Sequence, residues 1–124
     1  MGVTSPLVEV EIIESEVVQG RGTARVDWLA RKADGWVRAA EVDGAVVERR
    51  DAGPGTVWER AIRCTLPVGA ELLRVEVRPG KEVRRDPLDY LQKGRAGASA
   101  TTVRRLYRVT RRGTVRPVEP PAPR

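Results

Sequence analysis

The sequence predicts a single all-β domain, an antiparallel β-sandwich of about seven or eight strands. Several segments alternate apolar and polar residues with the period of a half-buried strand, and turn signals separate them. The chain has 124 residues, a usual length for one domain. We expect the domain to cover residues 7–118, between an N-terminal tail at 1–6 and a proline-rich tail at 119–124.

The first strand is expected at residues 8–18, where the alternation shifts by one residue. Val8 and Ile12 fall on one face, whereas Ile13 and Val17 fall on the other. Such a shift is typical of a β-bulge, or of a strand that crosses from one sheet to another.

Two Asp-Gly pairs, Asp34-Gly35 and Asp43-Gly44, predict tight hairpin turns, because both central positions of such turns need positive φ. Together they predict a meander of three strands. These strands are expected at residues 23–32, 36–42 and 45–50.

The remaining strands are expected at 57–66, 71–78, 101–110 and 114–118. In the second of these, Leu73, Val75 and Val77 are expected to face the core, because they alternate with charged residues. Taken together, the strand patterns place the following residues in or beside the core: Trp28, Trp58, Ile62, Leu66, Val75 and Tyr107.

Residues 80–100 interrupt the run of strands. Asp86 is a suitable N-cap and Pro87 suits the first helical position, so a short helix is expected at 87–93. Insertions into a scaffold often carry binding residues, although this one is equally explained as a cover for the open end of the sandwich. The candidate partner-binding residues are Arg84, Arg85, Tyr90, Lys93, Arg95, Arg104 and Arg105.

In strand number, length and the tryptophan on an early strand, residues 7–118 resemble an immunoglobulin- or fibronectin-type sandwich. The chain lacks the cysteine pair of antibody-type domains. The resemblance implies a fold and no function, because sandwiches of this type serve many functions.

The composition argues against an enzyme. There is no histidine, which excludes Ser-His-Asp and Cys-His mechanisms. The single cysteine, Cys64, is expected to be an inert core residue between Ile62 and Leu66, and a lone thiol favours a reducing, cytoplasmic location. We expect no cofactor, no small-molecule substrate, no secretory leader and no membrane span.

An acidic cluster on the first strand offers the one alternative. Glu9, Glu11, Glu14 and Glu16 could form a hydrolytic pair or hold a hard cation. The interpretation we favour is a solvated strand face whose charges discourage edge-to-edge pairing.

Charge is divided unevenly, with acidic residues in excess over residues 1–62 and basic residues in excess over 63–124. A basic half is typical of proteins that bind nucleic acid. Arginine greatly outnumbers lysine and phenylalanine is absent, however, a bias that a GC-rich genome would also produce.

The sequence therefore predicts a non-enzymatic protein-interaction or assembly module, with a protein partner or self-association through the Glu9–Glu16 strand. The alternative is sequence-independent nucleic-acid binding through the basic C-terminal half. An enzyme would require a metal at the acidic cluster or a small molecule near Tyr90.

Overall fold

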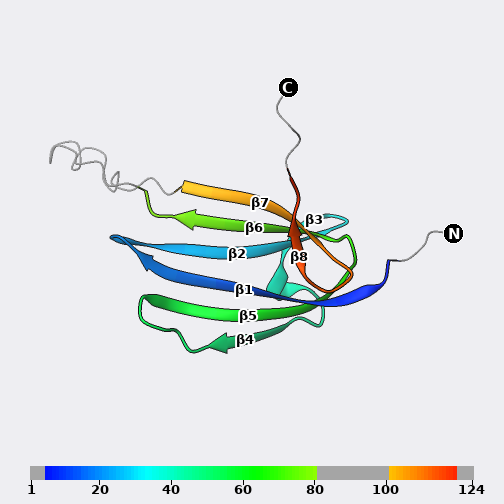
Figure 1. Cartoon of the computed structure of the whole chain (residues 1–124), viewed down its shortest axis with the longest axis horizontal. Helices are drawn as coiled ribbons and strands as arrows, with labels where there is room; N and C mark the ends of the chain where they lie inside the picture. The colour runs from blue at the N-terminus through cyan, green and yellow to red at the C-terminus, as the bar shows by residue number, and fades with distance from the viewer. Residues whose placement is uncertain (1–4, 81–100, 120–124) are drawn as a thin grey trace, which may run out of the picture.

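The computed structural model describes residues 5–80 and 101–119, which form one antiparallel sheet (Figure 1). The elements are β1 (Leu7–Gln19), β2 (Gly22–Lys32), β3 (Gly35–Arg38), the 3-10 turn η1 (Ala39–Glu41), β4 (Val46–Arg50), β5 (Thr56–Pro67), β6 (Glu71–Arg78), β7 (Thr101–Val109) and β8 (Val115–Pro117). The order across the sheet is β4-β5-β1-β2-β6-β7-β8, with β3 paired to β2.

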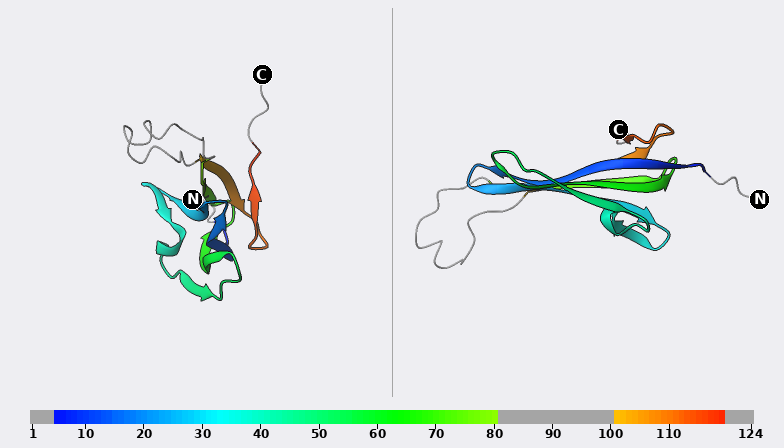
Figure 2. Two further views of the ribbon diagram at one scale, coloured as in Figure 1. Left: turned by 90° about the vertical axis from the view of Figure 1, so that its left-hand side faces the viewer. Right: turned by 90° about the horizontal axis from the view of Figure 1, so that it is seen from below.

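The all-β, antiparallel prediction is confirmed. The arrangement differs from a sandwich, because the described strands belong to one continuous sheet rather than to two. Figure 2 shows this sheet curled, with β3 and η1 on one side of the central strands and β8 on the other. The helix expected at 87–93 lies outside the described residues.

The predicted meander is half correct. The chain turns tightly between β2 and β3, where Lys32 pairs with Gly35. The turn lies one residue earlier than predicted, with Ala33 and Asp34 at its centre, and Asp34 does not have the positive φ that was expected. After Arg38 it forms η1 instead of continuing as a strand, and β4 then pairs with β5. Ala39 and Val42 are buried where the chain leaves β3. Burial of these apolar side chains favours this path over the hairpin that Asp43-Gly44 predicted.

One edge of β2 is shared by two strands. Residues 22–26 pair with β1, whereas residues 29–32 pair with β3. The opposite edge of β2 is occupied by β6, which pairs with residues 25–30. β1 therefore leaves β2 at a fork near residues 27–28 and continues along β5, with which it forms the longest ladder of the sheet.

The core cluster draws on most strands and on η1. Its members are Val10, Ile12, Trp28, Ala30, Ala39, Val42, Ile62, Cys64, Leu66, Leu72 and Val109. Trp28, Ile62 and Leu66 lie there as predicted. Tyr107 packs against the cluster, and its ring centroid lies 5.0 Å from that of Trp28.

Two of the predicted core residues lie elsewhere. Trp58 is half-buried and belongs to a polar pocket, and Val75 is half-buried outside the core cluster. In β6 the fully buried residue is Leu72, which is on the opposite face from Leu73 and Val75. The curl of the sheet buries different faces in different strands, so alternation alone predicted the wrong face here.

The turn between β7 and β8 packs directly on β1. A Cβ built on Gly113 would lie 2.4 Å from the main-chain oxygen of Glu9, and Gly113 has φ +78°. Glycine is needed at this contact both for its backbone conformation and for the close approach. In the described part of the chain, no helix has the length and apolar character needed to cross a membrane.

Candidate anion-binding site

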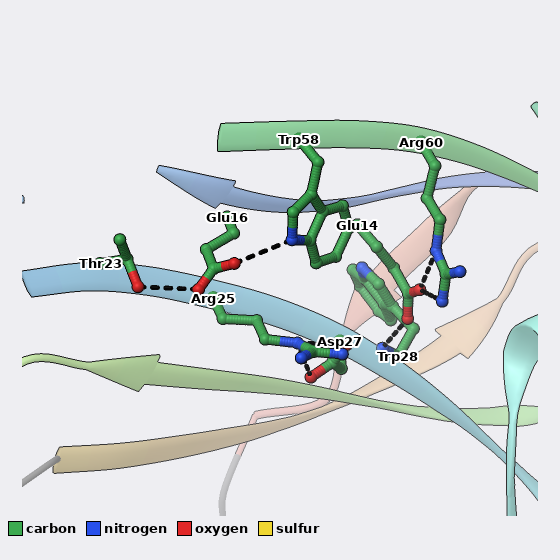
Figure 3. Close-up of polar contacts among 8 residues, drawn as sticks. All are labelled: Glu14, Glu16, Thr23, Arg25, Asp27, Trp28, Trp58 and Arg60. Carbon is green, nitrogen blue, oxygen red and sulfur yellow. Dashed lines mark hydrogen bonds and ion pairs between the residues drawn. The ribbon is translucent and has the colours of Figure 1, made fainter. Parts of the chain in front are cut away.

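A buried carboxylate occupies the fork between β1 and β2. Within the described ranges, Glu14 is the one buried charged side chain, with 2% of its surface exposed. Its Oε2 accepts a hydrogen bond from the main-chain N–H of Trp28 at 2.7 Å. Its Oε1 accepts two from Arg60, from Nε at 2.8 Å and from Nη2 at 2.5 Å (Figure 3). The buried charge is therefore paired and fully hydrogen-bonded, as burial of a carboxylate requires.

The alternation of β1 is continuous through this glutamate. Val10, Ile12 and Glu14 all point inward and are buried, and the register with β5 shifts only later, between Glu16 and Val17. The bulge expected near Ile13 was wrong in position. A glutamate at an inward position interrupts the apolar pattern while leaving the strand regular.

A second glutamate of β1, Glu16, holds the side chain of Trp58. The Glu16 carboxylate accepts hydrogen bonds from Thr23 Oγ1 at 2.8 Å and from the Trp58 indole N–H at 2.9 Å (Figure 3). These two bonds, that from Thr23 first, lower the pKa of Glu16 below its usual range. The Arg25 and Arg60 guanidinium carbons lie 5.3 and 5.6 Å from the centroid of the Trp58 ring, within range of cation–π attraction.

Trp58, Arg25 and Arg60 form part of the lining of a concave pocket of about 530 Å³. Its lining residues come from β2, the end of β3, β4, β5 and the loop before β5. They are Arg25, Arg38, Arg49, Arg50, Ala52, Val57, Trp58, Glu59 and Arg60. We call this surface the arginine pocket.

Three of the pocket arginines are neutralised within the protein. Arg60 pairs with Glu14, Arg25 with Asp27 at 3.0 Å, and Arg50 with Glu11 at 2.8 Å. Arg38 and Arg49 form no ion pair with any described residue.

Arg49 also faces a like charge. It lies directly opposite Arg60 in the β4–β5 register, and like charges in that arrangement are destabilising. Because Glu14 already neutralises Arg60, an external anion would find its free partner in Arg49. Guanidinium groups bind carboxylates and phosphates through paired hydrogen bonds, which makes the arginine pocket a candidate anion-binding site.

The acidic cluster does not form the site that the sequence suggested as an alternative. Glu11 takes Arg50 as its partner, whereas Glu14 and Glu16 lie on the other face of β1 with partners of their own. No group of three metal-ligating side chains occurs among the residues described. β1 pairs with β5 along most of its length, and only residues 15–19 also pair with β2. Self-association through this strand stays a prediction.

Most of the predicted partner-binding residues cannot be compared with this pocket. Arg84, Arg85, Tyr90, Lys93 and Arg95 lie outside the described residues. Arg104 and Arg105 are exposed neighbours on β7 that point to opposite faces, where they lie across from Val75 and Arg74. Neither lines the arginine pocket.

Sequence reasoning missed the arginine pocket because its members are far apart in the chain. Arg25, Arg38, Arg49 and Arg60 all fall in the acidic half, where no basic run draws attention to them. They come together only because β1 pairs with both β5 and β2, while β4 pairs with β5 and β3 pairs with β2. Comparison with protein-family models, with curated proteins and with solved structures finds no match for this chain.

Proposed function

We propose that the domain is a non-enzymatic protein-interaction module that binds an acidic segment of a partner protein in the arginine pocket. The observation that carries this proposal is the pair of cations without a carboxylate partner, Arg38 and Arg49, beside the half-buried ring of Trp58. Arginine and tryptophan are the residue types that contribute most to binding at protein interfaces.

The balance of charge in the pocket favours a carboxylate ligand over a nucleic acid. Glu59 lies in the lining, and Glu11, Glu14 and Asp27 each neutralise an arginine. What remains is a local cationic site, whereas a phosphodiester chain is bound by a long basic track that contacts many phosphates. A short acidic peptide segment suits a local site of this kind.

Nucleic-acid binding is the second candidate, and the observation that favours it lies at the other end of the sheet. Arg108 is directly opposite Arg116, and Arg74 is directly opposite Arg105. Arg74 is already paired with Glu76 at 3.3 Å, so Arg105, Arg108 and Arg116 are the cations that phosphates would neutralise. The insertion residues Arg84, Arg85, Lys93 and Arg95, which lie outside the described residues, are further candidates for this binding.

The two candidates are separated by titrating the protein with a short glutamate-rich peptide and with single-stranded DNA of matched charge. Replacing Arg38 and Arg49 by Ser should weaken peptide binding at least about tenfold, because each charged hydrogen-bonded contact is worth roughly 1.5–3 kcal/mol. The matched control replaces Arg111 and Arg112, which are exposed in the β7–β8 turn and outside the pocket, and should bind the peptide as the parent does.

Unchanged peptide affinity in the Arg38→Ser, Arg49→Ser variant would contradict the proposal. A third variant, in which Arg84, Arg85, Lys93 and Arg95 become Ser, tests the insertion. Loss of DNA binding in that variant, with no peptide binding by any form, would establish the second candidate instead.

A further inference from the structure

We infer that the acidic partner segment binds as an added β-strand along the outer edge of β4, with one acidic side chain directed at Arg49. This inference rests on the proposed function and specifies how the same site recognises its ligand. It is carried by an open sheet edge that borders the arginine pocket.

β4 is an edge strand. It stands at the end of the strand order and pairs with β5 on one side, and no other described strand pairs with it. All five of its residues are exposed, including Val46 at 51% and Val47 at 42%. Proteins usually protect such edges with charged side chains, proline, a bulge or a covering segment, because unpaired main-chain groups accept further strands. β4 has charges of both signs and no proline, so a strand with complementary charges can still pair with it.

The two faces of β4 differ in whether their charged side chains have ion-pair partners. Arg50 and Glu48 share one face, where Arg50 is paired with Glu11 and Glu48 lies 3.7 Å from Arg63. Val47 and Arg49 share the other face, where they lie opposite Ile62 and Arg60. We call it the pocket face because Arg49 and Arg60 line the pocket there, although Arg50 also reaches the lining from the end of the strand. The pocket face of β4 therefore presents one exposed apolar residue and one cation without a partner.

This layout defines the chemistry of the ligand. An added strand alternates its side chains between the two faces, so residues two apart in the ligand reach the pocket face together. One of them should be acidic, to pair with Arg49 and Arg38, and the other apolar, to cover Val47. The residue between them lies opposite Glu48, so it should be uncharged or basic and not acidic. The ligand is thus an extended segment in which an acid follows or precedes an aliphatic residue by two positions.

Charge complementarity favours this ligand over a second copy of the chain. When two copies of β4 pair antiparallel over their full length, the two-fold axis places Glu48 opposite its own counterpart. Like charges directly opposite one another in a ladder are destabilising. A separate acidic segment meets no such repulsion.

The test uses the full chain and a synthetic peptide with the repeat Glu-Thr-Val-Thr, which places glutamate and valine two positions apart and therefore on the same face. Two further peptides carry N-methyl groups on alternate amides, in the two complementary phases. In an added strand only every second amide points toward the neighbouring strand, so methylation in one phase should weaken binding at least about tenfold and in the other should leave it nearly unchanged. Hydrogen exchange should slow at alternate amides of β4 when the unmodified peptide binds.

The outcomes distinguish this inference from the proposed function. If both methylated peptides bind as tightly as the unmodified one and β4 gains no protection, strand addition is overturned while anion binding in the pocket stands. If the unmodified peptide fails to bind, both are overturned. If the free protein sediments as a dimer whose β4 amides are already protected, a second copy occupies the edge and the inference is overturned.

Discussion

The carboxylate of Glu14 accepts the main-chain N–H of Trp28 at 2.7 Å, at the place where β1 and β2 separate. Extending the β1–β2 register by two residues would pair Trp28 with Ile13. Instead, the Trp28 indole N–H donates to the Ile13 carbonyl oxygen at 3.1 Å. Two side chains thus replace main-chain partners, and the sheet can fork without leaving these groups unsatisfied.

Removing the Glu14 carboxylate should be strongly destabilising. Glu14→Ala leaves the Trp28 N–H and the Arg60 guanidinium without their acceptor, and breaking a buried ion pair of this kind costs about 3 kcal/mol or more. Glu14→Gln keeps an acceptor for the N–H and should lose less. Urea denaturation of both variants measures the difference. Equal stability of the parent and Glu14→Ala would show that the fork does not depend on this carboxylate.

The indole N–H of Trp28 can be tested separately from its ring. Trp28→Phe keeps an aromatic ring against Tyr107 but removes the donor to the Ile13 carbonyl oxygen. We expect a loss of about 1 kcal/mol in the free energy of unfolding, the usual net contribution of one hydrogen bond, because this bond is only partly buried. Trp58→Phe provides a comparison at a half-buried tryptophan and should cost less.

Gly113→Ala should detach the β7–β8 turn from β1. The added methyl group would meet the Glu9 main-chain oxygen at 2.4 Å, and the positive φ of Gly113 disfavours alanine as well. A destabilisation of about 1–3 kcal/mol is expected. The matched control is Gly44→Ala, where φ is +79° and nothing lies within 4 Å of the added carbon. Thermal melting of the two variants should differ clearly, and equal melting temperatures would contradict the close approach.

The low pKa of Glu16 predicts a defined pH dependence. A carboxyl group whose pKa is lowered by folding contributes stability above its usual pKa of 4.5 and loses that contribution as the pH falls through the lowered value. The parent should therefore exceed Glu16→Gln in stability at neutral pH, and the difference should shrink in acid. Glu9→Gln, at an exposed position of β1, is the control. A difference that stays constant with pH would argue against the role of Thr23 and Trp58 in holding the ionised form.

Cys64 should react slowly with thiol reagents in the native protein. Burial raises the pKa of the Cys64 thiol, which reduces the fraction of reactive thiolate, and only 1% of the residue is exposed. Labelling should become fast in denaturant. Rapid labelling of the folded protein would show that β5 opens readily near this position.

The strands themselves could be predicted, because alternation and turn residues are local signals. β2 and β5 lie close to their expected bounds, and Trp28 and Ile62 are in the core. The fork could not be predicted, since it depends on a glutamate at an inward position, which local patterns treat as an interruption. The sequence also did not predict that the chain forms η1 after β3 instead of continuing as a strand. Burial of Ala39 and Val42 is decided by tertiary packing, and the preceding turn residues do not reveal it.

The arginine pocket could not be predicted from the sequence for a different reason. Arg25 and Arg60 approach the same tryptophan ring from separate strands, and nothing in the spacing of residues along the chain relates them. The excess of basic residues in the C-terminal half instead predicted a binding surface in that half. An isolated arginine in a strand has the same local pattern whether it faces water or converges with others.

The long ladder between β1 and β5 also has a consequence for how quickly the native state can form. Its partners, such as Leu7 with Pro67, are distant in sequence, so a large loop must close before their hydrogen bonds are gained. The β1–β2 hairpin can form early from neighbouring residues, but β1 remains half-unpaired until β5 arrives. Folding is therefore expected on the slow timescale of non-local β-proteins, roughly milliseconds to seconds. In that interval the inner face of β1 is exposed to other chains, so refolding at low protein concentration should raise the yield of folded protein.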